Sequence, residues 1–217
     1  MKLVKWITVI FAAVLTMGFL PSGASGQVAY DQLPKVFDSS VPRDVQISIA
    51  LSAAPSKLRN KATVYVLGPK GFEKAREGTN GVSCLVGRHF TKSGETTIEP
   101  ECYDVEGSRT LLLPDLYREE LRVKGTPEDE IKTDIENGYK DGRFKAPSKP
   151  GVRYMLSSDN RLGPTPAGGT VHVPPHFMFY APYMTGKDLG YDSVAPFLVQ
   201  PGQPYTTMIV FPDPNLK

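Results

Sequence analysis

Apolar residues fill the start of the chain almost without interruption from position 6 to position 20. Two lysines precede this run, and Pro21 and several small residues follow it. A charged start, an apolar run and a small-residue segment are the three parts of a secretory signal peptide. We therefore expect residues 1–26 to be a signal peptide that is cleaved before Gln27. The alternative is an uncleaved anchor, but the run is shorter than the roughly 20 residues that a membrane span needs.

Helical periodicity begins after a loose lead-in over residues 27–40. Between about 41 and 54, apolar residues recur on one face of a helix, with Pro42 in the first turn and Pro55 after the end. Ser40 is of a residue type that caps helix N-termini. We expect a short N-terminal helix whose inward face carries Ile47, Ala50, Leu51 and Ala54.

Strand patterns follow this helix. Residues 62–90 contain a hairpin pattern, then the turn GTNG at 78–81, then the apolar run VSCLVG. We expect a three-stranded meander there. The polar and acid-rich residues 91–101 predict a solvated loop or a ragged hairpin.

Two amphipathic helices are predicted over about 114–140. The first begins at Pro114 and ends at Gly125. The second has Thr126 as its cap and Pro127 at its first helical position, with an acid three residues after the cap. We expect this helical hairpin to pack on a sheet or to cover a groove, with its charged residues on a solvent-exposed outer face.

Further strand patterns occupy the last third of the chain, at VRYMLSS, HFMFYAP, PFLVQPG and YTTMIVFP. Strands, then helices, then more strands predict an α+β fold with a largely antiparallel sheet. The length that remains after a leader suits a single globular α+β domain over residues 41–217.

Charge excludes some classes of partner. The formal net charge is +2 and falls to about zero once the two lysines of the leader are removed. A near-neutral domain without a long basic run is a poor nucleic-acid binder, because phosphate neutralisation supplies most of that affinity. No later apolar run is long enough to span a membrane. We therefore expect no nucleic-acid partner and no membrane attachment after the leader is cleaved.

Cys84 and Cys102 are the only cysteines in the chain. An even pair in an exported protein predicts a disulfide. Two free thiols or a metal-binding pair are the alternatives, but a zinc site would need further ligands at short spacing, and none flank these cysteines. The pair therefore indicates an oxidising compartment, the periplasm or the outside of the cell.

The stretch VHVPPHFMFYAPY at residues 171–183 is the densest in candidate chemistry. Strand alternation places His176 and Tyr180 on one face. In extended geometry His172 and His176 lie roughly 13 Å apart, too far for one metal ion. The two prolines between them favour a bend, which would bring the imidazoles together, with His89 as a third ligand and Glu101 or Asp104 as a carboxylate ligand.

Three interpretations of this stretch remain open. The first gives the histidines and aromatic residues a purely structural role. The second is a binding cleft in which His176, Tyr180 and Arg88 contact a small polar ligand. The third is a metal-assisted hydrolase or oxidase that uses His172, His176 and His89. The chain has no phosphate-binding loop, no dinucleotide glycine fingerprint, no His-Glu-x-x-His motif and no nucleophile elbow.

Several segments together resemble an uncharacterised family of exported bacterial proteins. These segments are SAAP, ATVYVLGPKGFEKAREGTNGVSCLVGR, ECYDVEGSRTLLLP, GVRYMLSS and PHFMFYAPYMTGKDLG. The resemblance runs from about residue 50 to the C-terminus. It implies an exported bacterial protein of one domain, and it implies no activity, ligand or site residue.

We therefore predict a soluble, exported α+β domain that acts as a binding or structural module of the bacterial envelope. The alternative is the metal-assisted hydrolase or oxidase described above. A catalytic role is less favoured, and no cofactor and no metal ligand is assigned. The candidate ligand-binding residues are Arg88, His89, His172, His176 and Tyr180.

Overall fold

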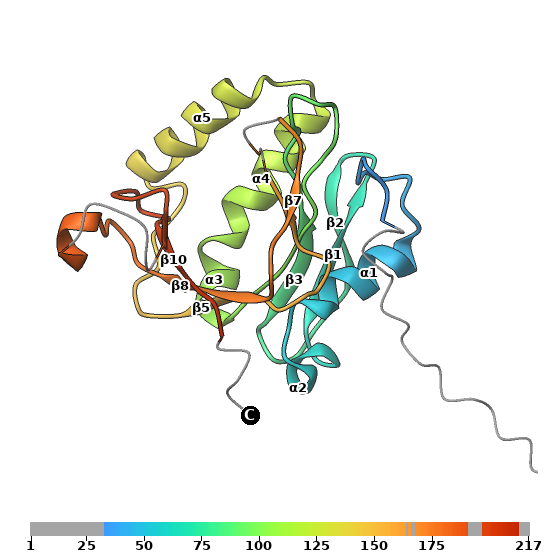
Figure 1. The fold of residues 1–217 in the computed structure, drawn as a ribbon, viewed down its shortest axis with the longest axis horizontal. Coiled ribbons are helices and arrows are strands. Elements are labelled where there is room, and N and C mark those ends of the chain that lie inside the picture. The colour runs from blue at the N-terminus through green and yellow to red at the C-terminus, as the bar shows by residue number, and fades with distance from the viewer. Residues whose placement is uncertain (1–32, 164, 166–167, 191–196, 213–217) are drawn as a thin grey trace, which may run out of the picture.

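Eight strands pair into one sheet in the computed structural model, which describes residues 33–163, 165, 168–190 and 197–212. The strand order is β2-β1-β3-β4-β5-β8-β10-β9, and every neighbouring pair is antiparallel except β1 with β3. Helices cover both faces of the sheet (Figure 1), so the predicted α+β class with a largely antiparallel sheet is confirmed. The strands are β1 (Thr63–Gly68), β2 (Gly71–Arg76), β3 (Ser83–Gly87), β4 (Glu99–Tyr103), β5 (Val152–Met155), β8 (His176–Tyr180), β9 (Phe197–Val199) and β10 (Thr207–Val210).

The helices of the described part of the chain include all three that the periodicity predicts. The N-terminal helix is α1, within the expected range 41–54, and the helical hairpin consists of α4 and α5. A one-turn helix, α3, precedes α4 and was not anticipated. The helices are α1 (Arg43–Ser52), α2 (Ser56–Arg59), α3 (Val105–Arg109), α4 (Leu112–Val123), α5 (Glu128–Lys140) and the 3₁₀ helix η2 (Gly186–Leu189).

Neither of the two predicted side-chain caps forms. The helix α1 begins after Pro42, and the Ser40 hydroxyl donates instead to the Asp38 carboxylate. The helix α5 begins after Pro127, so Thr126 lies one residue too early to cap it. In both helices the proline has extended ψ, and its carbonyl accepts the first helical hydrogen bond. The proline is therefore the cap residue and not the first helical residue.

The meander expected over residues 62–90 is wrong in its third strand. The strand β3 pairs with β1 in parallel, with Val64 opposite Cys84, and does not pair with β2. Gly78 lies so close to the backbone of Thr63 that a Cβ there would meet the Thr63 nitrogen at 2.2 Å. The segment after β2 therefore crosses over the start of β1 and brings β3 to the free edge of β1.

Of the two alternatives for residues 91–101, the ragged hairpin is confirmed, because Phe90 pairs with Thr96 in an antiparallel bridge. The segment is not a solvated loop throughout. Thr96, Thr97 and Ile98 are buried, and β4 begins at Glu99. The threonine hydroxyls accept hydrogen bonds from backbone N–H groups, Thr96 from Phe37 and Thr97 from His89. Small polar side chains thus become buried because they satisfy the backbone of neighbouring segments.

The helix α1 and the disulfide lie on the same face of the sheet. Cys84 and Cys102 stand opposite each other on β3 and β4, are fully buried, and are joined in a disulfide, as predicted. They pack in a cluster with apolar residues of α1, including Ile49 and Ala50. The hairpin of α4 and α5 lies on the other side of the sheet (Figure 1).

A proline pair separates β8 from a second, two-stranded sheet. Pro174 and Pro175 lie between that sheet and β8, where the prediction placed a bend. The alternation predicted for β8 is also confirmed, because His176 and Met178 are buried whereas Phe179 is 41% exposed. The two short strands are β6 (Arg161–Leu162) and β7 (Val171–His172).

The expected signal peptide at residues 1–26 lies outside the described residues, as do residues 27–32 of the lead-in at 27–40. Residues 191–196, which precede β9, also lie outside them. None of the helices that the structure describes combines the length and the apolar character needed to cross a membrane.

Candidate functional site

A cavity of about 360 Å³ lies between the sheet and the α4–α5 hairpin. Because side chains alternate along a strand, the two residues that each of β3, β4, β5, β8 and β10 contributes to the lining are separated by one residue. The helices contribute Pro114, Asp115, Arg118, Arg122, Ile135 and Tyr139 to the opposite wall. The residues of these five strands that line it are Leu85, Gly87, Glu99, Glu101, Arg153, Met155, His176, Met178, Thr207 and Ile209.

The helix α4 turns a charged stripe toward this cavity. Asp115, Arg118, Glu119 and Arg122 recur at intervals of three and four residues, so they share one helical face. The side chains of Glu119 and Arg122 are only 1% and 6% exposed. The expectation that the charges of the hairpin form a solvent-exposed outer face is therefore wrong for α4. The stripe lies inside because charged groups from the sheet and from the segment after β3 pair with it.

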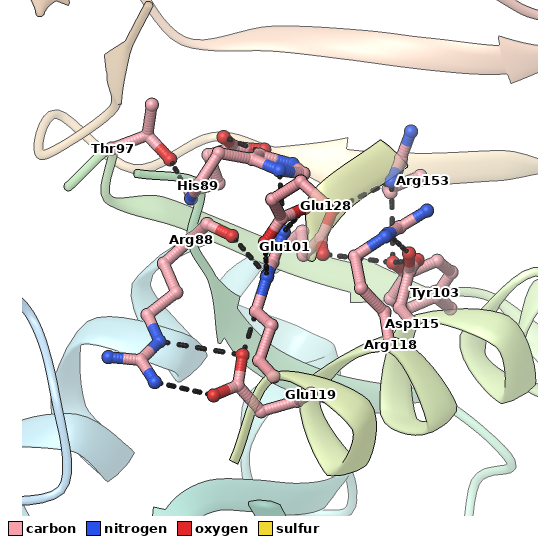
Figure 2. A network of polar contacts seen from close by, with 12 residues as sticks. Arg88, His89, Thr97, Glu101, Tyr103, Asp115, Arg118, Glu119, Glu128 and Arg153 are labelled. Carbon is pink, nitrogen blue, oxygen red and sulfur yellow. Dashed lines mark hydrogen bonds and ion pairs between the residues drawn. The ribbon is translucent and has the colours of Figure 1, made fainter. Parts of the chain in front are cut away.

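One ionic cluster fixes the α4 side of the cavity (Figure 2). The guanidinium group of Arg88 donates to both carboxylate oxygens of Glu119, at 2.5 Å and 3.4 Å. Arg122 donates to the Arg88 carbonyl at 2.6 Å and to Glu128 at the start of α5 at 3.0 Å. Arg122 also lies 2.9 Å from Nδ1 of His89. Each of these cations has a carboxylate partner, so this cluster positions the cavity wall.

A second cluster, visible on the right of Figure 2, is centred on a tyrosine hydroxyl. The Tyr103 oxygen lies 2.9 Å from Glu101 Oε1 and 2.5 Å from Asp115 Oδ2. Arg153 Nη1 donates to Glu101 at 2.8 Å, and Arg118 Nη1 donates to Asp115. A phenol has one proton and can donate it to only one carboxylate. The other carboxyl group must then carry a proton of its own to bond the phenol oxygen.

The electrostatic environment assigns that proton to Glu101. Burial raises the pKa of Glu101 to about 7, although Arg153 acts in the opposite direction. Burial also raises the pKa of Asp115, but Arg118, Arg153 and the Tyr103 hydroxyl outweigh it, and the pKa lies below its usual value. Near neutral pH, Asp115 is therefore the anion that accepts from Tyr103, and Glu101 holds its proton about half of the time.

Four buried polar atoms of the cavity lining have no hydrogen-bond partner among the described residues. They belong to side chains from four different elements, namely β5, β8, β10 and α5. Buried polar groups are nearly always satisfied in folded proteins, and each exception calls for an explanation. A shared location in one cavity indicates that a ligand or water satisfies them. The four atoms are Arg153 Nε, His176 Nε2, Thr207 Oγ1 and Tyr139 Oη.

The Arg153 guanidinium presents a whole unused edge. Its bonds to Glu101 and to the Tyr103 hydroxyl are both made through Nη1. Nε and Nη2 form the edge that binds a carboxylate with two parallel bonds. Nε is buried without a partner among the described residues, and the Arg153 bonds to them all use Nη1 and none uses Nη2. Arg118 likewise uses only Nη1. The side chains of Arg153 and Arg118 are 17% and 25% exposed, so both are shielded cations with donors to spare.

His176 presents a hydrogen-bond acceptor to the same cavity. Its Nδ1 lies 2.9 Å from the carbonyl of Pro174, which can only accept, so Nδ1 carries the proton. Burial lowers the pKa of the imidazole, helped by Arg153 and opposed by Glu99. The ring is therefore neutral at physiological pH, and Nε2 has a free lone pair.

Of the five candidate residues that the sequence predicts, the structure places three in the cavity lining and two outside it. Arg88, His89 and His176 line the cavity. His172 is exposed on β7, and its Nε2 lies 2.8 Å from the Ser158 carbonyl. The bend at the prolines thus directs His172 outward and His176 inward, instead of bringing the two rings together.

Tyr180 lies on the same face as His176 but beyond the cavity lining. Its hydroxyl donates to the Val152 carbonyl at 2.9 Å and lies 3.1 Å from Asp104. Gly107 of α3 packs directly against the ring, where a Cβ would lie 1.9 Å from the hydroxyl oxygen. This side chain therefore fastens α3 to β5 and β8.

Sequence reasoning missed most of the wall that carries charge. Glu101 and Arg153 are not among the five candidate ligand-binding residues, because one lay in a segment assigned to a loop or hairpin and the other in an unremarkable strand. The spacing of Asp115, Arg118 and Arg122 was visible in the sequence. That spacing describes an exposed charged face equally well, so it did not identify the site.

Comparison of the chain with protein-family models, with curated proteins and with solved structures gives no match. Among the described residues, no group of three or more histidine, cysteine, aspartate or glutamate side chains is arranged to hold a metal ion. The class is therefore defined by fold and site alone: an α+β protein with a shielded cavity that carries spare arginine donors.

Proposed function

We propose that this protein is a binding module that holds a small anionic ligand in the cavity between the sheet and the α4–α5 hairpin. The observation that carries the proposal is the unused Nε–Nη2 edge of Arg153, which lines the cavity and has no partner among the described residues. Two parallel N–H donors on one planar cation match the two oxygens of a carboxylate. Leaving such a cation edge buried without a partner is unfavourable, so an anion stabilises it.

The surroundings of this edge support an anion of low charge. Arg118 adds a second guanidinium with unused donors, held through Asp115 to the same cluster. Protonation of Glu101, whose pKa burial raises to about 7, would leave the positive charge of Arg153 without its partner anion. The volume of about 360 Å³ lies at the small end of the range for ligand pockets, which indicates a small molecule.

We also propose that this binding module is exported and works in the bacterial envelope, in the periplasm or outside the cell. Two observations support this compartment. The buried Cys84–Cys102 disulfide is of a kind that persists in oxidising surroundings, and the first 26 residues follow the signal-peptide pattern.

The metal-assisted hydrolase or oxidase gains less support from the geometry. It needs His172, His176 and His89 to converge. His172, however, is exposed on the two-stranded sheet, and its ring contacts the Ser158 carbonyl. Only His89 and His176 line the cavity. We therefore favour ligand binding over metal-assisted catalysis.

The proposal is tested by calorimetric titration with a panel of small anions. The panel contains inorganic phosphate, acetate, cyclohexanecarboxylate and D-glucuronate, and the protein is the purified chain without its leader. We expect saturable binding of at least one carboxylate with a Kd of ~1 mM or tighter, which corresponds to about −4 kcal/mol. The variant Arg153→Lys keeps the charge but removes the two-donor edge, and binding should weaken by ~tenfold or more.

A matched control uses an arginine outside the cavity. Arg143 pairs with Asp134 on the exposed surface of α5 and does not line the cavity. The variant Arg143→Lys should bind as the unmodified protein does. Absence of binding by every anion, or equal loss in both variants, would refute the proposed function.

A further inference from the structure

We infer that the anion is a sugar acid, a ring-shaped carboxylate that carries several hydroxyl groups. This inference rests on the proposed function, because it places the carboxylate on the free edge of Arg153. It adds the identity of the rest of the molecule, which follows from the other unpaired groups around the cavity. Those groups call for hydroxyl partners and for a flat apolar contact.

The acceptor on β8 requires a donor from the ligand. His176 is fully buried, and its Nε2 has no partner among the described residues. Since Nδ1 is engaged by the Pro174 carbonyl, Nε2 can only accept while the ring is neutral. A simple carboxylate has no proton to give, whereas a hydroxyl group next to it has one.

Two further residues of the cavity lining carry buried hydroxyl groups that have no partner among the described residues. Thr207 Oγ1 on β10 is buried and unpaired among the described residues, and so is Tyr139 Oη on α5. A hydroxyl can donate and accept, so each is suited to pair with a ligand hydroxyl. These atoms come from opposite walls of the cavity, so a ligand with hydroxyls around its whole rim satisfies them best.

Two aromatic rings supply the flat contact. Tyr139 and Tyr205 both line the cavity, with ring centroids 5.2 Å apart and planes inclined by 33°. Their faces are apolar and their hydroxyl ends are polar. A sugar ring has the same combination, because its C–H groups form apolar faces and its hydroxyls form a polar rim.

The acids of the same wall favour a carboxylate over a phosphate. Glu99, Glu101 and Asp115 line the cavity together with Arg118 and Arg153. Once Glu101 is protonated, these two cations and the two remaining acids already balance, so a ligand of low charge is favoured. A doubly charged phosphate would place a further charge near Glu99 and Asp115, and like charges at short range are unfavourable.

The test compares ligands of similar size that differ in one feature. D-glucuronate and D-galacturonate have the carboxylate and the hydroxyls, cyclohexanecarboxylate has only the carboxylate, and D-glucose has only the hydroxyls. We expect at least one of the two uronates to bind ~tenfold or more tightly than both cyclohexanecarboxylate and glucose, since each well-formed hydrogen bond contributes about 1 kcal/mol. Inorganic phosphate should bind more weakly than that uronate.

Two variants assign the hydroxyl contacts. Thr207→Val preserves the shape of the side chain and removes its hydroxyl, and His176→Phe removes the acceptor but keeps an aromatic ring. Each should weaken uronate binding by several-fold to ~tenfold and leave cyclohexanecarboxylate binding unchanged. Circular dichroism and the melting temperature show whether each variant is folded. If His176→Phe is unfolded, the binding result for Thr207→Val alone tests the inference.

The outcomes separate this inference from the proposed function. Equal affinities for the uronates and cyclohexanecarboxylate, or tighter binding of phosphate, would overturn the sugar acid while anion binding at Arg153 stands. Binding of glucose as tight as that of the uronates would also overturn it. Failure of every anion to bind would overturn both.

Discussion

Arg88 and Glu119 form a buried two-point ion pair that joins the end of β3 to the middle of α4. Their side chains are 10% and 1% exposed, and the shorter of the two contacts is 2.5 Å. Glu119 also accepts from Arg122, so a single carboxylate lies between two guanidinium groups. The helix α4 is therefore held against the cavity by charge as well as by apolar packing.

Removal of the Glu119 charge should strongly destabilise the fold. The variant Glu119→Ala leaves Arg88 and Arg122 shielded from solvent without that carboxylate, and breaking a buried pair typically costs about 3–5 kcal/mol. Urea unfolding, followed by fluorescence, measures the free energy of unfolding. As a control, Glu136→Ala removes the exposed partner of Lys132, 3.9 Å away on α5, and should change it by less than about 0.5 kcal/mol. Similar losses in the two variants would contradict this account of α4.

The disulfide should contribute a large part of the stability. Cys84 and Cys102 close a loop with a sequence separation of 18 and lie in the main apolar cluster. Constraint of the unfolded chain by a loop of this size contributes about 3 kcal/mol. The double variant Cys84→Ala/Cys102→Ala should lose at least that much in urea unfolding. An unchanged unfolding free energy would show that the bond is absent from the purified protein.

The protonation of Glu101 should make stability fall as pH rises toward and past neutrality. Its pKa is about 7 in the folded protein against an ordinary value of 4.5, so the folded state binds more protons between these values. The contribution of Glu101 to the free energy of unfolding is fully present below pH 4.5. It is lost as pH rises through 7, and the loss is up to about 3 kcal/mol. The groups that face it are Arg153, Asp115, Glu99 and Tyr103.

The variant Glu101→Gln isolates this effect, because the amide resembles the protonated acid and does not titrate. The lowered pKa of His176 acts in the opposite direction, since its contribution is lost as pH falls below 6.5. The difference in unfolding free energy between the two proteins therefore reports the titration of Glu101, because His176 is present in both. We expect the unmodified protein to lose stability relative to Glu101→Gln from pH 5 to pH 8.5. A constant difference across that range would refute the assignment of the proton.

Gly107 should tolerate no side chain, because Tyr180 occupies the space. A Cβ there would lie 1.9 Å from the Tyr180 hydroxyl oxygen and 2.7 Å from its Cζ. Overpacking of this kind costs about 1–3 kcal/mol, so Gly107→Ala should lower the melting temperature clearly. Gly169→Ala is the control, since nothing lies within 3.6 Å of a Cβ at that position. Equal melting temperatures would contradict the packing of Tyr180 against α3.

Local patterns in the sequence predicted the elements that depend on local physics. The alternation in β8 follows from strand geometry, and the apolar face of α1 follows from helical periodicity. The disulfide followed from the count of cysteines and the leader pattern. Each of these features depends only on residues that are neighbours in the sequence or on a single pair of residues.

Features that depend on distant partners could not be read in this way. Asp115 and Arg118 form the same pattern on a wet helix face and on a buried one, and only Tyr103 and the cavity decide between them. The parallel pairing of β1 with β3 depends on the crossing of the segment at Gly78. Burial raises the pKa of Glu101, and the charged groups that modify it, Arg153, Asp115 and Glu99, lie on three separate elements.

The Pro174 carbonyl selects the tautomer of His176 from only two residues away. Neither proline has an N–H, so the β5–β8 ladder stops at the residue whose imidazole that carbonyl orients. The turn thus determines where the strand pairing ends, and it also determines that Nε2 of His176 is the unprotonated nitrogen. Replacement of Pro174 and Pro175 would therefore change the turn and, with it, which nitrogen of His176 carries the proton. It would do so without altering any residue of the lining.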